Sequence, residues 1–176
     1  MTGEAPSGSE RWLTAGQDLL RRGGVVAVKL RSLTDELGLT TGSFYHHFDG
    51  MSDYLDQLAR FYGADQVRQN VELIDGPDPR ERLRRLMAMA RTHKMVPLDA
   101  AMRDWAGSNP IAAASVQAAD EHLMQFVAAA FEDLGYPRRE AQVRALLLQS
   151  VGVARVLPPW ETLAEDADVV LEILAP

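Results

Sequence analysis

The segment from Thr40 to His47 carries side chains whose types and spacing suit hydrogen bonding to a nucleic acid. Hydroxyl, phenol and imidazole groups follow one another closely here: Thr40, Thr41, Ser43, Tyr45, His46 and His47. Such groups donate hydrogen bonds to phosphate oxygens without adding a permanent charge. Thr41, Gly42 and Ser43 are also small enough to enter a DNA groove. The segment therefore predicts a surface that contacts DNA.

Two short helices joined by a glycine turn are predicted around these side chains. In the first helix, apolar residues recur at i, i+3 and i+7 and share one face: Leu30, Leu33 and Leu37. Gly38 then stands where a chain leaving a helix favours a positive φ. Thr40 can cap the next helix, which is expected to run to about Phe48 with Phe44 and Phe48 on its inward face. This is the layout of a helix-turn-helix motif.

The residues of this motif divide into two predicted roles. Arg31, Thr41 and Ser43 are expected to approach base edges. Phosphate contacts are expected from four other side chains: Lys29, Tyr45, His46 and His47. Thr40 and Gly42 complete the predicted DNA-binding set.

The segment from about Arg11 to Leu58 resembles the DNA-binding domain of TetR-type transcriptional repressors. Their common pattern ends in a Gly-Thr-Leu-Tyr-His-His-Phe-like run, which stands here as Gly42-Ser-Phe-Tyr-His-His-Phe48. The turn at Gly38, the preceding short helix with Arg31 near its start, and the glycine pair Gly23-Gly24 belong to the same resemblance.

This resemblance implies an all-helical homodimer that binds double-stranded DNA at a partly palindromic site. It also implies a larger C-terminal domain that binds a small molecule and thereby lowers the affinity for DNA. The run from Leu98 to Ala106 is similar to a run in some members of the family.

The composition agrees with such a protein. The chain of 176 residues is 47% hydrophobic and has no cysteine, so disulfides, zinc fingers and thiol chemistry are excluded. No apolar run approaches the roughly 18 residues of a membrane helix. Residues 1–9 are expected to form a flexible arm rather than a signal peptide, which predicts a cytoplasmic protein. The net charge is −7, but residues 11–48 carry +2, so the acidity lies outside the motif.

Helical patterns, but none of period two, cover the rest of the chain, so an all-α fold is predicted. Ser9 is expected to cap a helix over 10–22, and a long helix over 51–74 is expected to connect two domains. Further helices are expected over 80–95, 99–106, 111–134, 138–157 and 161–174. The predicted divisions are an arm at 1–9, a three-helix DNA-binding domain at 10–50 and a ligand-binding and dimerisation domain at 51–176.

The helix over 138–157 is apolar on two sides, one of which can face its own core and the other a second subunit. With the last helix it predicts a four-helix dimer interface that includes Val143, Leu147, Val151, Ala154, Leu163, Ala167, Val170 and Leu171. The alternative is that Leu146-Leu147-Leu148 marks the centre of a monomeric core.

The middle helices carry large, adaptable side chains that are typical of a cavity for an apolar ligand. The predicted ligand-binding residues are Phe61, Met87, His93, Met102, Trp105, Met124 and Phe126. The alternative is that each of them belongs to ordinary core or surface packing.

Neither catalysis nor a cofactor is predicted. No phosphate-binding glycine loop or nucleophile motif is present, and the adjacent His46 and His47 point to different faces, so no metal site is expected. The predicted function is a ligand-responsive transcriptional regulator, a repressor released from its operator by a small molecule. The alternative is a helical small-molecule-binding or adaptor protein that has lost DNA binding, because Met51 stands where many TetR-like sequences have a phosphate-contacting lysine.

Overall fold

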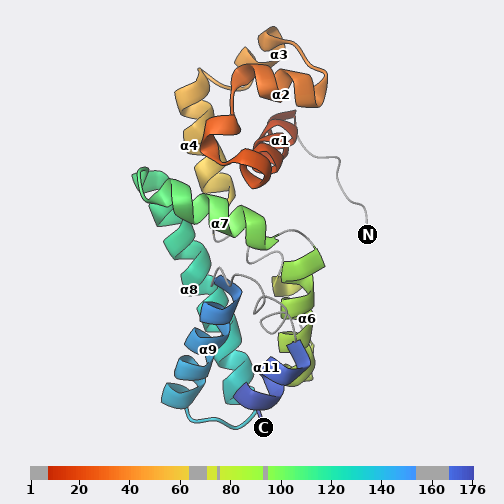
Figure 1. Cartoon of the computed structure of the whole chain (residues 1–176), viewed down its shortest axis with the longest axis vertical. Coiled ribbons are helices and arrows are strands. Elements are labelled where there is room, and N and C mark those ends of the chain that lie inside the picture. Colours follow the sequence, from red (N-terminus) through yellow and green to blue (C-terminus); the bar gives the residue numbers. More distant parts are fainter. Residues whose placement is uncertain (1–7, 64–70, 75, 93–94, 154–166) are drawn as a thin grey trace. The chain divides into compact units, whose positions relative to one another are not determined.

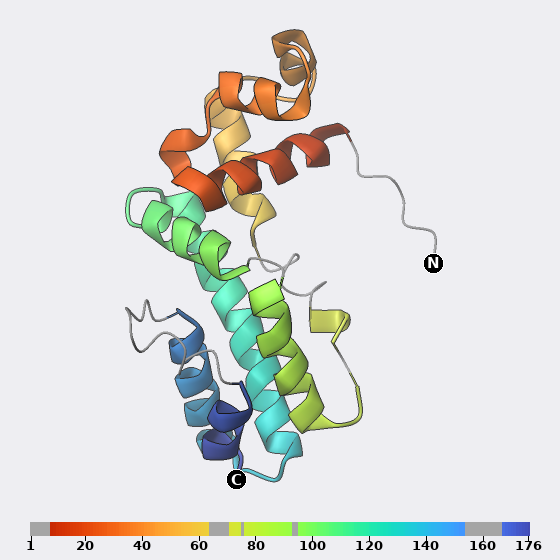
Figure 2. The same ribbon diagram turned by 45° about the vertical axis from the view of Figure 1, so that its right-hand side comes forward.

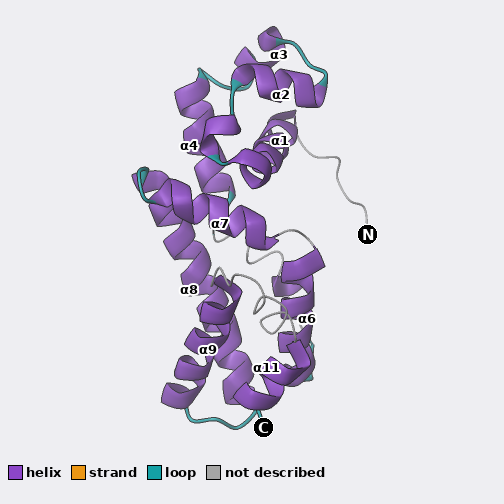
Figure 3. Cartoon of the chain, viewed as in Figure 1, coloured by secondary structure: helices purple, strands orange, loops and turns teal. Residues whose placement is uncertain are grey.

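The structure is a computed structural model that describes residues 8–63, 71–74, 76–92, 95–153 and 167–176. The N-terminal helices are α1 (Gly8–Gly23), the 3-10 turn η1 (Val25–Ala27), α2 (Leu30–Leu37), α3 (Thr41–Tyr45) and α4 (Met51–Phe61). They are followed by α6 (Pro79–Thr92), α7 (Met95–Ala106), α8 (Pro110–Asp133), α9 (Arg138–Val153) and α11 (Ala167–Leu174). None of the described residues forms a strand, so the predicted all-α class is confirmed (Figure 3).

The chain folds into two compact units. The first contains the chain up to Gly63 together with Pro97–Val116, and the second contains the remaining residues. The expected division into a DNA-binding domain at 10–50 and a second domain at 51–176 is functional and remains a prediction. Among the described residues, no helix is both long and apolar enough to cross a bilayer.

Aromatic side chains form the centre of the first unit. Trp12 of α1, Phe44 of α3 and Tyr54 of α4 have no exposed surface, and Phe48 is 2% exposed. The Phe44 ring lies 5.4 Å from both the Trp12 and the Tyr54 ring centroids. The Tyr54 hydroxyl donates a hydrogen bond of 2.8 Å to the Trp12 carbonyl oxygen. These contacts join α1, α3 and α4, so α3 rests on a packed aromatic base.

Gly16 allows α1 and α4 to approach each other closely. A Cβ atom added at this position would lie 2.1 Å from the Tyr54 hydroxyl oxygen and 3.0 Å from both δ carbons of Leu58. The first of these distances is far below normal van der Waals contact and the other two are tight, so a side chain at residue 16 would displace the Tyr54 and Leu58 side chains of α4. The glycine is therefore needed for the position of α4 beneath the helix-turn-helix.

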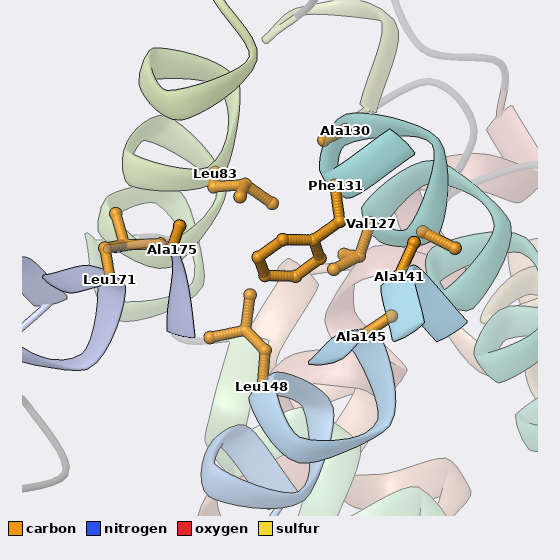
Figure 4. Close-up of a cluster of buried hydrophobic side chains, with 10 residues drawn as sticks. Leu83, Val127, Ala130, Phe131, Ala141, Ala145, Leu148, Leu171 and Ala175 are labelled. Carbon is orange, nitrogen blue, oxygen red and sulfur yellow. The ribbon is translucent and has the colours of Figure 1, made fainter. Parts of the chain in front are cut away.

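The second unit has its own hydrophobic core, built from α6, α8, α9 and α11. Figure 4 shows the Phe131 ring between Leu83, Leu148 and Leu171, which come from different helices. Small residues of α9, Ala141 and Ala145, let that helix lie close to α8. Figures 1 and 2 both show α6, α8 and α9 running side by side around this cluster.

Arginine side chains hold the ends of α11 in the second unit. Arg80 donates to the Ala175 carbonyl oxygen and Arg144 to the Leu174 carbonyl oxygen. The last carbonyls of a helix have no partner within it, and cationic donors near them are stabilising. At the other end, Arg84 pairs with Asp168 at 2.9 Å. The last helix is therefore tied to α6 and α9 by charge as well as by apolar packing.

Several helix boundaries differ from the predictions. Helix α6 ends at Thr92 rather than at residue 95, and α7 begins at Met95 rather than at residue 99. Helix α1 begins at Gly8, so Ser9 lies in its first turn and is not its cap. Helix α3 ends at Tyr45 rather than Phe48, because the His47 N–H bonds to the Phe44 carbonyl, a tighter i to i−3 contact. Helix α4 ends at Phe61 rather than Ile74, with a similar tightening at Gly63. The parts of the last two predicted helices over 154–157 and 161–166 lie outside the described residues.

Candidate DNA interface

The turn between α2 and α3 has the geometry expected from the sequence. Gly38 has φ 64° and donates its N–H to the Thr34 carbonyl oxygen, so it ends α2 in a left-handed conformation. The Thr40 hydroxyl accepts a hydrogen bond of 3.2 Å from the Ser43 N–H, so it caps α3. Both local predictions are confirmed, and together they fix the direction in which α3 starts.

The predicted DNA-binding side chains of α3 lie on the outside of the first unit. The exposed residues are Thr40, Thr41, Gly42 and His46, together with Tyr45, which is 58% exposed. Ser43 and His47 are half-buried. Phe44 and Phe48 face inward as predicted, so the polar residues between them cannot turn into the core. The segment thus presents small and hydrogen-bonding groups to solvent from a rigid base.

The basic residues near the motif are partly neutralised by carboxylates. Arg21 pairs with Asp18 at 2.6 Å, and Arg22 pairs with Glu36 of α2 at 2.6 Å. Arg31 and Asp35, one turn apart on α2, are 3.8 Å apart with side chains that are 93% and 73% exposed. A pair this exposed contributes little to stability, so the Arg31 guanidinium can leave it for another acceptor.

The turn from α3 into α4 is held by one carboxylate. Asp53 accepts hydrogen bonds from the Gln57 amide at 3.0 Å and from the Asp49 backbone N–H at 3.1 Å. These two donors, the Gln57 amide first, hold the pKa of Asp53 below its ordinary value. Burial raises the pKa of the neighbouring Tyr54, so its phenol stays a neutral donor to Trp12. Met51 is half-buried at the start of α4.

One contact at this surface has no signal in the sequence. Gly8, the first residue of α1, lies against the imidazole ring of His47. The two residues are far apart in the sequence, and neither is part of a periodic pattern that would bring them together. The ring of His47 also contacts that of His46, with centroids 5.1 Å apart.

The predicted ligand-binding residues fall into both compact units. Met102 has no exposed surface and Trp105 is 6% exposed, and both lie on α7 in the first unit, where Phe61 ends α4. In the second unit, three candidates pack against the buried cluster: Met87, Met124 and Phe126. His93 lies outside the described residues. The structure thus places these side chains in two separate cores, and their role in binding a ligand remains a prediction.

The α9 part of the predicted dimer interface presents an apolar surface. Val143 and Leu147 are 52% and 49% exposed, Leu146 beside them is 57% exposed, and Val151 is half-buried. The opposite face of α9, with Ala141, Ala145 and Leu148, packs on its own core. The expected arrangement of two apolar faces on one helix is therefore present, whereas Ala154 and Leu163 lie outside the described residues, as does the side chain of Ala167.

The assignment of Leu171 to the dimer interface is wrong. Leu171 is 1% exposed within the single chain and packs in the buried cluster, so it has no surface to give to a partner. Val170 also packs against this cluster. The residues of α11 that do reach the surface are Val169 at 48% and Ile173 at 71% exposure.

Comparison with known proteins identifies the fold. Neither a protein-family model nor a curated protein sequence matches the chain. A transcriptional regulator from Rhodococcus sp. Rha1 has a similar structure, with a TM-score of 0.74, 20% identity and 96% of each chain covered. A TetR transcriptional regulator from Legionella pneumophila has a TM-score of 0.73 and 15% identity, covering 98% of this chain and 96% of that one.

A third similar structure contains a bound molecule. The transcriptional regulator FadR from Bacillus subtilis, solved in complex with stearoyl-CoA, has a TM-score of 0.64 and 14% identity, covering 94% of this chain and 97% of that one. Because the likeness extends over nearly the whole length of all three structures, the chain has the fold of TetR-family transcriptional regulators.

Proposed function

We propose that the protein is a ligand-responsive, DNA-binding transcriptional regulator, and specifically a repressor that a small molecule releases from its operator. The observation that carries this proposal is the α2–turn–α3 segment. Its capped second helix displays Thr41, Ser43 and Tyr45 from an aromatic base formed by Trp12, Phe44 and Tyr54. A rigid base matters because base and phosphate contacts are directional and require a fixed frame. The fold shared with TetR-family regulators supports the same function.

The proposed DNA-bound form is a homodimer. The exposed apolar face of α9, with Val143, Leu146 and Leu147, is the surface that a second copy would cover. Each subunit contributes one α2–turn–α3 segment, which we call its reading head. Two reading heads related by a two-fold axis would meet two half-sites about 34–36 Å apart, which is one turn of DNA. A partly palindromic operator follows from this symmetry.

The proposed effector is an apolar small molecule bound among the middle helices. Three side chains that pack against the buried cluster of the second unit support this, Met87, Met124 and Phe126, because methionine and aromatic residues are typical of pockets for apolar ligands. A structure with the same fold, that of Bacillus subtilis FadR, is a complex with stearoyl-CoA. For the ligand to release DNA, it must bind the form with lower DNA affinity more tightly, since equal affinity for both forms would shift nothing.

A gel-shift assay with the DNA that flanks the protein's own gene tests the proposal. Tyr45→Ala should weaken binding to all sequences alike, because it removes a phosphate contact. Arg31→Ala should also relax the sequence preference, by about 1–3 kcal/mol if its guanidinium contacts a guanine with two hydrogen bonds. Arg138→Ala, an exposed arginine at the start of α9, should change neither property. If Tyr45→Ala and Arg31→Ala both bind DNA like the parent protein, α3 does not read DNA.

The second candidate is a helical small-molecule-binding or adaptor protein without DNA binding. Met51 favours it, because this residue is half-buried at the first position of α4 and offers no charge to a phosphate. In the same assay, a folded and dimeric protein that shifts none of the flanking DNA would support this candidate and contradict the repressor.

A further inference from the structure

The first residue of α1 limits the space around one histidine of the DNA-facing surface. A Cβ atom added at Gly8 would lie 2.7 Å from Cε1 and 2.9 Å from Nε2 of His47. Real Cβ atoms essentially never come this close to another heavy atom. With His47 where it is, glycine is therefore the residue that fits at position 8.

The backbone of His47 is already fixed by other contacts. Its N–H bonds to the Phe44 carbonyl oxygen at 3.0 Å, and the N–H of Phe48 bonds to the same oxygen at 3.1 Å. The Phe48 side chain, which is 2% exposed, anchors the following residue in the core. What remains free at His47 is the rotation of its side chain, and that rotation decides where the imidazole N–H groups point.

Three neighbours surround the His47 ring. The rings of His46 and Phe48 meet it edge to face, with centroids 5.1 Å and 6.2 Å away. On the side of α1, a Cβ atom added at Gly8 would meet the Cε1 and Nε2 atoms of the ring. A larger residue at position 8 would rotate the imidazole away from α1.

We propose that Gly8 is a positioning residue for DNA binding: because it has no side chain, it leaves the room in which the His47 imidazole takes the orientation that contacts a phosphate. The inference rests on the proposed function, in which His47 is one of the phosphate-binding residues. A hydrogen bond weakens steeply when its donor points away from the acceptor. The rings of His46 and Phe48 already restrict the His47 side chain, which therefore loses less rotational freedom when DNA binds. Gly8 therefore acts on the DNA through His47 and makes no contact of its own.

The variant Gly8→Ala tests this role without disturbing the fold. The atoms that the new methyl group meets belong to the end of a half-buried side chain, which can rotate away, so the backbone of α1 need not move. The melting temperature should therefore stay equal to that of the parent. Gly107→Ala is the matched control, because its new Cβ atom would lie 3.4 Å from the Asp104 carbonyl oxygen, an ordinary contact.

The expected result in a DNA-binding titration is a loss of affinity of about three- to tenfold per reading head for Gly8→Ala, the size of one neutral hydrogen bond. In a His47→Ala background the same change at Gly8 should have no further effect, because its target is gone. The NMR resonance of the His47 Cε1–H group should move in Gly8→Ala without DNA, and should stay unchanged in Gly107→Ala.

Two results would overturn the proposal in distinguishable ways. If the parent binds DNA and Gly8→Ala weakens binding equally with and without His47, or leaves it unchanged, then Gly8 does not act through His47. If the parent binds no DNA under conditions in which it is folded and dimeric, the role of Gly8 and the proposed function are both wrong.

Discussion

Replacing Gly16 by alanine should destabilise the DNA-binding unit. The added methyl group would lie 2.1 Å from the Tyr54 hydroxyl oxygen, so α1 and α4 would have to separate by more than 1 Å to restore normal contact. Overpacking of this kind costs about 1–3 kcal/mol. Moving the phenol would also break its buried bond to the Trp12 carbonyl oxygen, and an unsatisfied buried group costs about 1–3 kcal/mol more.

One effect acts in the opposite direction. Alanine is favoured over glycine inside a helix by about 1 kcal/mol. The net loss in the free energy of unfolding at Gly16→Ala is therefore about 1–5 kcal/mol. For a unit of this size, a loss of about 2 kcal/mol lowers the melting temperature by roughly 10 °C. Circular dichroism during heating measures this shift, and Gly107→Ala in the same unit serves as the control because its new methyl group has room.

A second substitution separates this steric argument from a general effect of mutation. In Tyr54→Phe the hydroxyl oxygen is absent, so the closest contact of the new methyl group disappears and the 3.0 Å contacts with Leu58 remain. The double variant Gly16→Ala/Tyr54→Phe should therefore be more stable than the sum of the two single changes predicts, by about 1 kcal/mol or more. A Gly16→Ala protein that melts like the parent, or a strictly additive double variant, would refute the reasoning.

Two further predictions concern salt and assembly. Because Arg21 and Arg22 are paired with carboxylates and Arg31 is expected to contact bases, the remaining cations near the motif are Arg11 and Lys29, which have no ion pair among the described residues. With two phosphate-binding cations in each reading head, a plot of the logarithm of DNA affinity against the logarithm of salt concentration should have a slope of about −4 for the dimer. A slope of about −8 or steeper would show that the paired arginines bind phosphates as well. Leu147→Asp should place a charge in the dimer interface and yield a monomer in light scattering, whereas Gln125→Asp, at an exposed position of α8, should remain dimeric. An unchanged dimer in Leu147→Asp would move the interface away from α9.

The features that the sequence predicted correctly are local ones. The positive φ of Gly38 and the capping of α3 by Thr40 depend on a few neighbouring residues, so their signals are complete within a short segment. The inward direction of Phe44 and Phe48 follows from their i, i+4 spacing in the same way. The resemblance to TetR-type repressors rests on this segment, and the structural comparisons extend the shared fold to nearly the whole chain.

The wrong predictions concern residues whose inward or outward direction is decided by packing between helices rather than by the local sequence pattern. Six of the eight residues of α11 are apolar, so the periodicity of this helix could not tell which stripe faces the core. The structure turns Leu171 and Ala175 inward and leaves Val169 and Ile173 exposed. The contact of Gly8 with His47 was likewise beyond the sequence, because it depends on how α1 lies against the segment after α3.

The sequence predicted one long connector helix over 51–74, whereas α4 ends at Phe61. Tyr62, the residue after α4, donates a hydrogen bond of 2.6 Å to one oxygen of Asp99 on α7, and Arg103 donates one of 2.7 Å to the other oxygen. Asp99 thus binds the end of α4 and its own helix with one carboxylate, within the first compact unit. A continuous helix over 51–74 would have moved as one rod. Because the described helix stops at Phe61 and is tied to α7, a ligand that repositions α3 under the proposed function has to shift α7 together with α4 or break the Tyr62–Asp99 bond.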